Sequence, residues 1–440
     1  MGSVFGKKPE EAHKDGVNNV QNAAVNNVQN PLTSGEYSVP VMGAEDVSKI
    51  TVPFAKVQVS LRKILEEHGL AIVTDVISAE EVLEFERYFM TDLLNVIDEE
   101  EIAASPQAVR DAYSEFKSKG LRAFPLRTAA EITQAAGFAL DRCLPHGTFA
   151  WAARKHPNVH KVFKAIFPSA AGFCTSVDVP FFTPGGQKQA ESTKFNAHVD
   201  QNKHDVRPGL GDCEVYQGVL YVWSAEGDHA STTAAWPGSH TSVWEEMMQD
   251  PSFKENGSHG FHYSEVAEMQ DFSLAQKLAA GWADHARRLP VPSGALLLWN
   301  SRTMHTGWKG GPRLAQAVCL EPVERRPLQE RLSKMRLIAL GLPSTHWAST
   351  AMQHDMSLGA PGVFSNDRTR ARGPDGSSHD AALLPLRPAL RPAGLVDGEV
   401  PEELEDLVDV DYRCVGMWDA PESVAPLLER SVQDHIKNYI

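Results

Sequence analysis

Cysteine pairs, long apolar runs and a signal-like leader are all missing from this chain of 440 residues. Its five cysteines include no Cys-x-x-Cys pair, which argues against a disulfide framework or zinc ribbon and favours a reducing compartment. The longest apolar stretches, such as Ala295–Trp299, are too short to span a bilayer, and the first thirty residues contain no apolar leader region. We therefore expect a soluble, cytoplasmic protein.

Positive charge is also in deficit. Lys and Arg number 42 against 57 Asp and Glu, which gives a formal net charge of -15, and no basic run is present. Nucleic acid and anionic membranes attract basic surfaces, so neither is an expected partner. Hydrophobic residues make up 42% of the chain, enough to fill a sizeable core. A small-molecule substrate fits this composition better, and no particular oligomeric state is favoured.

Local patterns predict helices first and strands later. The apolar face of residues 57–65 predicts a helix capped by Gly69, and Ser78 with Glu81 forms a capping-box pattern for the next helix. After residue 168 the pattern changes to short strand-like runs at 172–182, 215–224, 295–299 and 314–320. This order predicts an α+β fold with a β-barrel or jelly-roll core and helices packed outside it.

Composition divides the chain into three parts. Residues 1–45 are polar, Asn-rich and contain VNNVQN twice, so we expect a disordered N-terminal tail. Residues 46–325 carry the helix and strand patterns and form the predicted jelly-roll domain, with a helical insertion at 241–290. Residues 326–440 are expected to be a C-terminal extension, with a flexible linker in the Gly-, Ser-, Pro- and Arg-rich stretch 359–378.

Two segments carry the residues that suggest chemistry. KFNAHVDQN places His198 and Asp200 two residues apart, on the same face of an extended strand. This spacing alone is weak evidence, because roughly one His-x-Asp is expected by chance in such a chain. A second segment begins with the apolar run at Ala295 and adds His305, then Arg313 at the start of another apolar run.

Two imidazoles and one carboxylate on one side of a metal ion leave three coordination positions open, which suits non-haem Fe(II) oxygen chemistry. A 2-oxo acid can fill two of these positions and O2 the third. The far carboxylate of such an acid needs a fixed partner, and a guanidinium can bind it through two parallel hydrogen bonds. Arg313 is the candidate for this partner.

In these segments the chain resembles the phytanoyl-CoA dioxygenase family of Fe(II)/2-oxoglutarate oxygenases. The matching pieces, in order, are LAIVTDVISAEEV, AHVDQN, YQGVLYVWSA, WPGSH, GALLLWNSRTMHTG and PRLAQAV. The resemblance implies a double-stranded β-helix, with His198, Asp200 and His305 as iron ligands and Arg313 binding 2-oxoglutarate. It also implies a dioxygenase that oxidises a small or medium organic substrate and releases succinate and CO2.

Two positions qualify this resemblance. Asp200 is retained, whereas relatives that halogenate have Ala or Gly there, so hydroxylation or a similar oxidation is favoured. Ala315 stands where a Ser or Thr often provides a second donor to the carboxylate. Arg313 also lies eight residues after His305, closer than the family pattern implies, so Arg302 and Lys309 stay open as alternatives to it.

Neighbouring residues have two interpretations each. Gln217, on the strand after the metal motif, is either a cofactor-binding residue that reaches the oxo acid, or an amide that hydrogen-bonds a neighbouring strand. Tyr221 and Trp223 share its predicted strand face and either line a substrate pocket or fill the core. His204 and Asp205 are weaker metal-ligand alternatives, because adjacent strand residues point to opposite faces.

Two other functions are compatible with the same motifs. One is a jelly-roll binding or scaffold protein with a vestigial metal site. The other is a cupin-like hydrolase or isomerase that uses a different divalent metal and has no need of Arg313. We expect the dioxygenase, because it alone uses the arginine segment together with the His-Asp-His set.

Overall fold

The computed structural model describes most of the chain up to residue 325 and one short segment near the C-terminus. The described residues are 36–133, 138–139, 144–185, 193–194, 196–206, 209–227, 229–260, 262–325 and 383–386. The linker predicted at 359–378 lies outside them, as does most of the predicted extension 326–440. Within the described segment 383–386, Leu384 is buried in the largest apolar cluster.

Residues at the end of the predicted tail take part in the fold. Strand β1 (Glu36–Tyr37) pairs with β6 (Thr193–Lys194), and the side chains of Val39 and Met42 are buried. The predicted tail of residues 1–45 is therefore too long, because its last residues carry apolar side chains that pack on the domain. Residues 1–35 lie outside the described residues.

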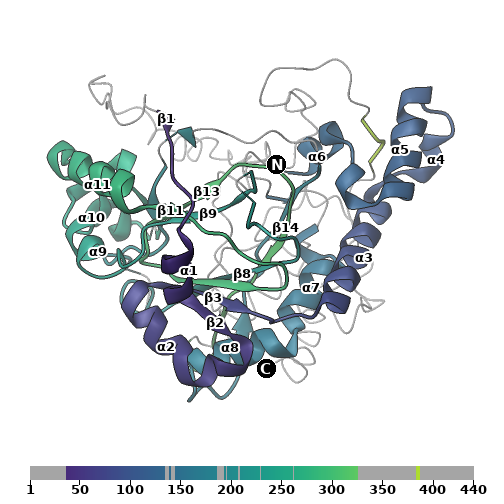
Figure 1. Ribbon diagram of the computed structural model, residues 1–440. Helices are drawn as coiled ribbons and strands as arrows, with labels where there is room; N and C mark the ends of the chain where they lie inside the picture. The colour runs from purple at the N-terminus through teal and green to yellow at the C-terminus, as the bar shows by residue number, and fades with distance from the viewer. Residues whose placement is uncertain are drawn as a thin grey trace, which may run out of the picture.

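Helices surround the strands on several sides. Figure 1 shows α9, α10 and α11 grouped on one side of the strands, with α3 to α7 on another and α2 and α8 below. Their bounds are α1 Ala44–Ile50, α2 Val57–His68, α3 Ala79–Val96, α4 Glu99–Ile102, α5 Gln107–Lys119, α6 Leu126–Ile132, α7 Thr148–Lys155, α8 Pro157–Ile166, α9 Ser242–Met247, α10 Pro251–Ser258 and α11 Phe272–His285.

Two main sheets form the centre, so the fold mixes helices and sheets. The five-stranded sheet has the order β10 (Ser264–Glu265), β7 (His198–Val199), β13 (His305–Trp308), β9 (Thr232–Ala235), β11 (Arg287–Arg288). The six-stranded sheet has the order β2 (Thr51–Pro53), β3 (Leu70–Thr74), β12 (Leu296–Asn300), β8 (Tyr216–Tyr221), β14 (Arg313–Ala317), β5 (Pro180–Thr183). A separate pair joins β4 (Phe173–Thr175) to β15 (Leu320–Pro322). All pairings are antiparallel except β2 with β3.

The two faces of the six-stranded sheet pack against different partners. On β12, Leu296 and Leu298 pack with α2, α3 and α8. Leu297 and Trp299 alternate with them and pack with Ala235 of the other sheet. The second face, here called the inner face, therefore lies between the two sheets. By the same alternation it includes Gln217, Val219, Tyr221, Leu297, Trp299, Arg313, Ala315 and Ala317.

The local helix signals predicted from sequence are confirmed. Helix α2 ends at His68, and Gly69 follows with a φ of 72°, the left-handed conformation that glycine adopts most easily. A Cβ at Gly69 would lie 2.4 Å from His240 Nδ1, so side-chain packing requires glycine here as well. Ser78 and Glu81 form the reciprocal capping box at the start of α3.

Residues 241–290, where the sequence predicts a helical insertion, contain two short strands as well as α9, α10 and α11. Strand β10 pairs with β7, and β11 pairs with β9. The insertion therefore adds a strand at each end of the five-stranded sheet. Strands of two residues leave too little periodicity to be predicted from sequence.

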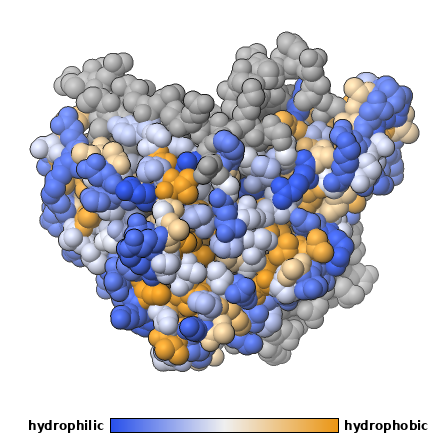
Figure 2. All heavy atoms as spheres, in the orientation of Figure 1, coloured by the Kyte–Doolittle hydropathy of each residue, from blue (hydrophilic) through white to orange (hydrophobic). Residues whose placement is uncertain are grey.

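The surface carries scattered apolar side chains. Figure 2 shows them among polar ones on the face in view. The large exposed apolar side chains of the described residues come from separate elements and are Val59, Leu83, Leu126, Val206 and Phe272. In the same part of the chain, no helix combines the length and apolar character needed to cross a membrane. The side chains that suggest chemistry lie instead between the sheets.

A buried carboxylate joins two of the helices. Asp92 on α3 is 2% exposed and accepts hydrogen bonds of 2.9 Å from the backbone N–H groups of Thr148 and Phe149. These groups belong to the first turn of α7, which has no side-chain cap of its own. Gly147 precedes them, and a Cβ there would lie 2.3 Å from Asp92 Oδ2. Asp92 therefore caps α7 from a neighbouring helix.

We predict that Asp92→Ala lowers the free energy of unfolding by about 2 kcal/mol, because it removes a buried carboxylate that accepts from two N–H groups, one of them in the buried residue Phe149. Denaturant unfolding followed by circular dichroism measures the loss. Asp271→Ala is the control, because Asp271 also accepts two N–H bonds at a helix start but lies exposed. An equal loss in both variants would contradict the assigned role of burial.

Candidate metal centre

Three side chains meet where β7 and β13 pair. His198 and His305 are in register on these neighbouring strands, and their ring centroids are 4.5 Å apart. Asp200 directly follows β7, and its N–H donates to the carbonyl of Ser301 at 3.0 Å. One ligand atom from each of the three residues lies within 4.8 Å of the others. The structure thus brings together the three residues that the sequence nominates as metal ligands.

Backbone carbonyls orient both histidine rings. His198 Nδ1 lies 2.7 Å from the carbonyl of Asn196, and His305 Nδ1 lies 3.0 Å from that of Thr303. A proton on each Nδ1 satisfies these bonds and leaves each Nε2 free to bind a metal. His305 Nε2 is 3.1 Å from Asp200 Oδ2, so this nitrogen already faces the carboxylate.

The surroundings favour the metal-binding form of His198. Burial, with a further contribution from His305, lowers the pKa of His198 to about 4. The imidazole is therefore neutral at pH 7, the form that binds metal ions. The side chains of Asp200 and His305 are only 13% and 7% exposed, which limits competition from water. Two imidazole nitrogens and one carboxylate oxygen suit Fe(II) and other divalent ions.

Gln217 supports the carboxylate of this cluster. It lies on the inner face of β8, is 6% exposed, and donates from Nε2 to Asp200 Oδ2 at 2.8 Å. Neither sequence-based alternative, the oxo acid or a neighbouring strand, included this contact. Hydrogen bonds of this kind fix the orientation of a metal ligand. A contact of Gln217 with the oxo acid stays a prediction.

Arg313 lies on the same inner face with its charge uncompensated. It is 4% exposed, its Nη2 donates to the Tyr221 hydroxyl at 3.0 Å, and its guanidinium carbon lies 4.0 Å from the centroid of the Phe181 ring. Its Nε is buried without a hydrogen-bond partner. Among the described residues no carboxylate pairs with it. A buried, unpaired guanidinium is costly, and an anionic ligand is the natural complement.

The metal candidates and Arg313 lie at different levels of the inner face. Gln217, which contacts Asp200, and Tyr221, which contacts Arg313, are four residues apart on β8. That offset corresponds to about 13 Å between the two backbone positions, and the reach of each side chain sets the gap between the functional groups. A ligand that satisfies both ends needs an acceptor group at each.

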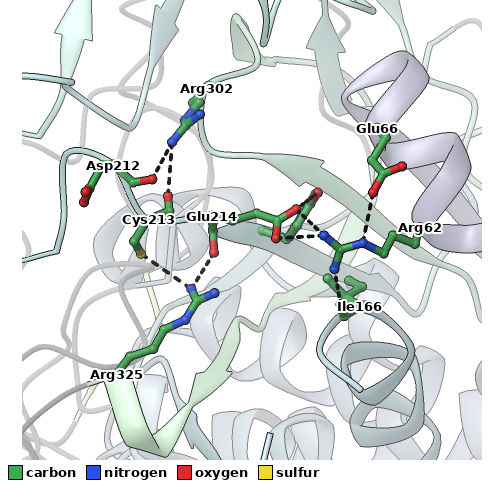
Figure 3. Close-up of polar contacts among 9 residues, drawn as sticks. Arg62, Glu66, Ile166, Asp212, Cys213, Glu214, Arg302 and Arg325 are labelled. Atoms are coloured by element: carbon green, nitrogen blue, oxygen red, sulfur yellow. Dashed lines mark hydrogen bonds and ion pairs between the residues drawn. The ribbon is translucent and has the colours of Figure 1, made fainter. Parts of the chain in front are cut away.

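The alternative cations are engaged elsewhere. Arg302 donates from Nε to Gln201 Oε1 at 3.2 Å and from Nη2 to the carbonyl of Asp212 at 2.9 Å. Figure 3 shows Arg302 pointing at this backbone, while Arg62 and Arg325 bind Glu214 just before β8. Lys309 is exposed.

The structure also shows where two other candidates from the sequence, His204 and Trp223, lie. His204 Nε2 bonds the carbonyl of Met248 at 2.7 Å, and His204 does not belong to the metal-ligand cluster. Trp223 lies beyond the end of β8, bonds Glu86 through Nε1 and stacks on Arg122. The predicted sharing of one strand face by Trp223 and Gln217 is wrong, because the strand ends at Tyr221 and the alternation stops there.

A tyrosine beside the metal candidates was missed by sequence reasoning. Tyr263 precedes β10, its ring centroid lies 4.8 Å from that of His198, and its hydroxyl donates to Glu265 Oε2 at 3.0 Å. Glu265 is in register with His198. Burial, together with the carboxylates of Glu265 and Asp200, raises the pKa of Tyr263, so its hydroxyl stays protonated. The alternation Tyr-Ser-Glu was the available signal, but it lies inside the segment interpreted as helical.

Comparison with known proteins gives no family assignment. No family model matches the sequence, and no curated protein matches it. The resemblance to the phytanoyl-CoA dioxygenase family therefore stays a prediction.

Several solved structures are similar at low sequence identity. One is GlcNAc Inducible Gene 2, GIG2 (DUF1479), from Candida albicans, 11% identical over 88% of this chain and 86% of that one, with a TM-score of 0.43. EctD from S. alaskensis, solved with 2-oxoglutarate and 5-hydroxyectoine, is 12% identical over 68% and 83%, with a TM-score of 0.36. The epimerase SnoN, solved with Fe3+, alpha ketoglutarate and nogalamycin RO, is 12% identical over 64% and 85%, with a TM-score of 0.33. These likenesses are weak, so the function is inferred below from the chain's own residues.

We predict that His198→Ala or His305→Ala weakens Fe(II) binding by more than about 100-fold, because each removes one of three ligands. Anaerobic calorimetry with Fe(II), or with Co(II) as a stable substitute, measures the affinity. His204→Ala is the matched control and should bind normally. If the His198 and His305 variants also bound as wild type, the metal assignment would be wrong.

We also predict that Gln217→Leu weakens metal binding by about 10-fold, because Asp200 loses the donor that orients it. The same calorimetric titration detects the change, and thermal unfolding shows whether the fold persists. An unchanged affinity in a folded Gln217→Leu protein would show that Asp200 does not depend on this hydrogen bond.

Proposed function

We propose that this chain is an Fe(II)- and 2-oxoglutarate-dependent dioxygenase that oxidises a small or medium organic substrate and releases succinate and CO2. The observation that carries the proposal is Arg313, a buried guanidinium without a carboxylate partner among the described residues. It shares the inner face with Gln217, which contacts the His-Asp-His cluster. A hydrolase or isomerase that uses the same metal ligands has no need of this cation.

The proposed fold is a double-stranded β-helix of the phytanoyl-CoA dioxygenase type. Its support is the strand order, because β7, β9 and β13 belong to one sheet whereas β8, β12 and β14 belong to the other. The chain therefore crosses between the sheets repeatedly, as a jelly roll requires. The candidate ligands lie at the end of β7 and the start of β13, where the two histidines are in register.

Each residue has a defined task under this proposal. His198, Asp200 and His305 hold the iron, and Gln217 keeps one carboxylate oxygen in place. When bound, iron together with 2-oxoglutarate and O2 supplies the oxidant for the substrate. Arg313 binds the far carboxylate of 2-oxoglutarate and so fixes its orientation.

The inner face also limits side reactions. The apolar residues between the sheets, among them Leu297 and Ala315, are buried and exclude bulk water from the co-substrate. Tyr263, just before β10, and Glu265 on β10 border His198 and are both half-buried. The proposed substrate approach is from this side. Because Asp200 is present, hydroxylation or a similar oxidation is proposed rather than halogenation.

We predict that Arg313→Ala weakens 2-oxoglutarate binding roughly 100-fold without changing Fe(II) affinity, because it removes a buried charge-assisted contact. The visible charge-transfer band of the Fe(II)–oxo acid chelate, recorded anaerobically during titration, reports the binding. Lys309→Ala, which alters an exposed cation on the same connection, should behave as wild type.

Three results separate the rival functions. A wild-type protein that binds Fe(II) but gives no band with 2-oxoglutarate would exclude the dioxygenase. Metal binding together with an Arg313→Ala variant that behaves as wild type would favour the hydrolase or isomerase. Absence of metal binding altogether would favour a binding or scaffold protein.

A further inference from the structure

Trp299 is the aromatic residue of the inner face that lies nearest to the metal candidates. It stands on β12 directly opposite Gln217 of β8, and its ring centroid lies 5.1 Å from that of His305. Cross-strand partners project to the same face, so Trp299 and Gln217 both face the space between the sheets. Trp299 is 6% exposed, which places the indole inside the protein rather than at its surface.

The indole N–H of Trp299 is an unused donor. Its Nε1 is buried and has no hydrogen-bond partner. Buried tryptophans normally satisfy this group, and burial without an acceptor is costly. Trp244 follows the rule, because its Nε1 donates to the carbonyl of Gln201 at 2.9 Å. The unpaired Trp299 N–H therefore suggests an acceptor that arrives with a ligand.

Two buried donors thus lack acceptors on one inner face. Arg313, with its unpaired Nε, hydrogen-bonds Tyr221 on β8. Trp299, with its unpaired Nε1, is in register with Gln217, four residues earlier on the same strand. A ligand with oxygen atoms at both ends can satisfy both donors. A monocarboxylate bound at Arg313 satisfies only the first of them.

We propose that the Trp299 indole N–H donates to an oxygen at the metal-binding end of the 2-oxo acid, while Arg313 binds its far carboxylate. The ligand class is a 2-oxo dicarboxylate, and the inference rests on the proposed function. Trp299 then selects against ligands that carry only the distal carboxylate, because those leave its N–H unsatisfied.

Replacement of Trp299 by Phe keeps a ring on β12 and removes only the donor. Trp308→Phe is the matched control, because Trp308 Nε1 is also buried without a partner, yet Trp308 packs on the opposite face of the five-stranded sheet. The probe is 2-oxoglutarate, titrated anaerobically into each Fe(II)-loaded protein and followed by the charge-transfer band. Calorimetry with the Mn(II)-loaded proteins provides a second measurement of 2-oxoglutarate affinity, without redox chemistry.

Trp299→Phe should bind 2-oxoglutarate about 10-fold more weakly than wild type, with unchanged metal affinity, whereas Trp308→Phe should match wild type. Equal 2-oxoglutarate affinities for wild type and Trp299→Phe would overturn the inference and leave the proposed function standing. Failure of the wild-type protein to bind 2-oxoglutarate would overturn both.

A second measurement uses the unaltered chain, in case Trp299→Phe does not fold. Protein labelled with 15N at its indole nitrogens and loaded with Zn(II) is titrated with 2-oxoglutarate. One indole N–H signal should move to lower field and exchange more slowly with solvent as its hydrogen bond forms. If 2-oxoglutarate binds and no indole signal responds, the inference is wrong.

Discussion

The in-register pairing of β7 with β13 is the constraint on which the candidate site depends. It places His198 opposite His305, and Asp200 follows two residues later. A slip of one residue in the pairing would move one of the histidines to the opposite face of the sheet. Two further contacts hold the register: β13 pairs with β9 from His305 to Trp308, and the Asp200 N–H bonds Ser301 in the preceding turn. Strand pairing therefore sets the arrangement of the three candidate ligands.

Some polar groups between the two sheets have hydrogen-bond partners, whereas others have none. Asp200 has its Gln217 donor, and both histidines have backbone acceptors, so the metal-binding groups are oriented before any ion arrives. Arg313 and Trp299 each keep a buried N–H without an acceptor. Such groups destabilise the folded chain, and a ligand that satisfies them recovers that free energy on binding. The candidate metal ligands are therefore oriented in advance, whereas Arg313 and Trp299 each keep an N–H group that, under the proposed function, a ligand satisfies.

Sequence reasoning located the residues that depend on strand alternation and short motifs. The helix end at Gly69, the Ser78–Glu81 capping box and the grouping of the His-Asp-His set all follow from local patterns or motif order. It missed contacts set by strand neighbours far apart in the chain. Gln217 reaches Asp200, Trp299 reaches His305, and Tyr263 lies beside His198, and each of these depends on pairing that local periodicity does not encode.

The departure at Ala315 has a structural counterpart. Ala315 stands where the phytanoyl-CoA dioxygenase family, which the sequence resembles, often carries a Ser or Thr that donates to the co-substrate carboxylate, and a methyl group cannot donate a hydrogen bond. Tyr221 is in register with Ala315 on the neighbouring strand, and its hydroxyl accepts a hydrogen bond from Arg313 Nη2 at 3.0 Å. The Tyr221 hydroxyl also lies 3.4 Å from Thr233 Oγ1. A hydroxyl can accept two hydrogen bonds and donate one, so Tyr221 can fix the guanidinium and, with Thr233 as the donor in that contact, offer its own proton to the carboxylate. Under the proposed function, the donor has moved across one strand pair, which lets β14 carry a small residue at that position.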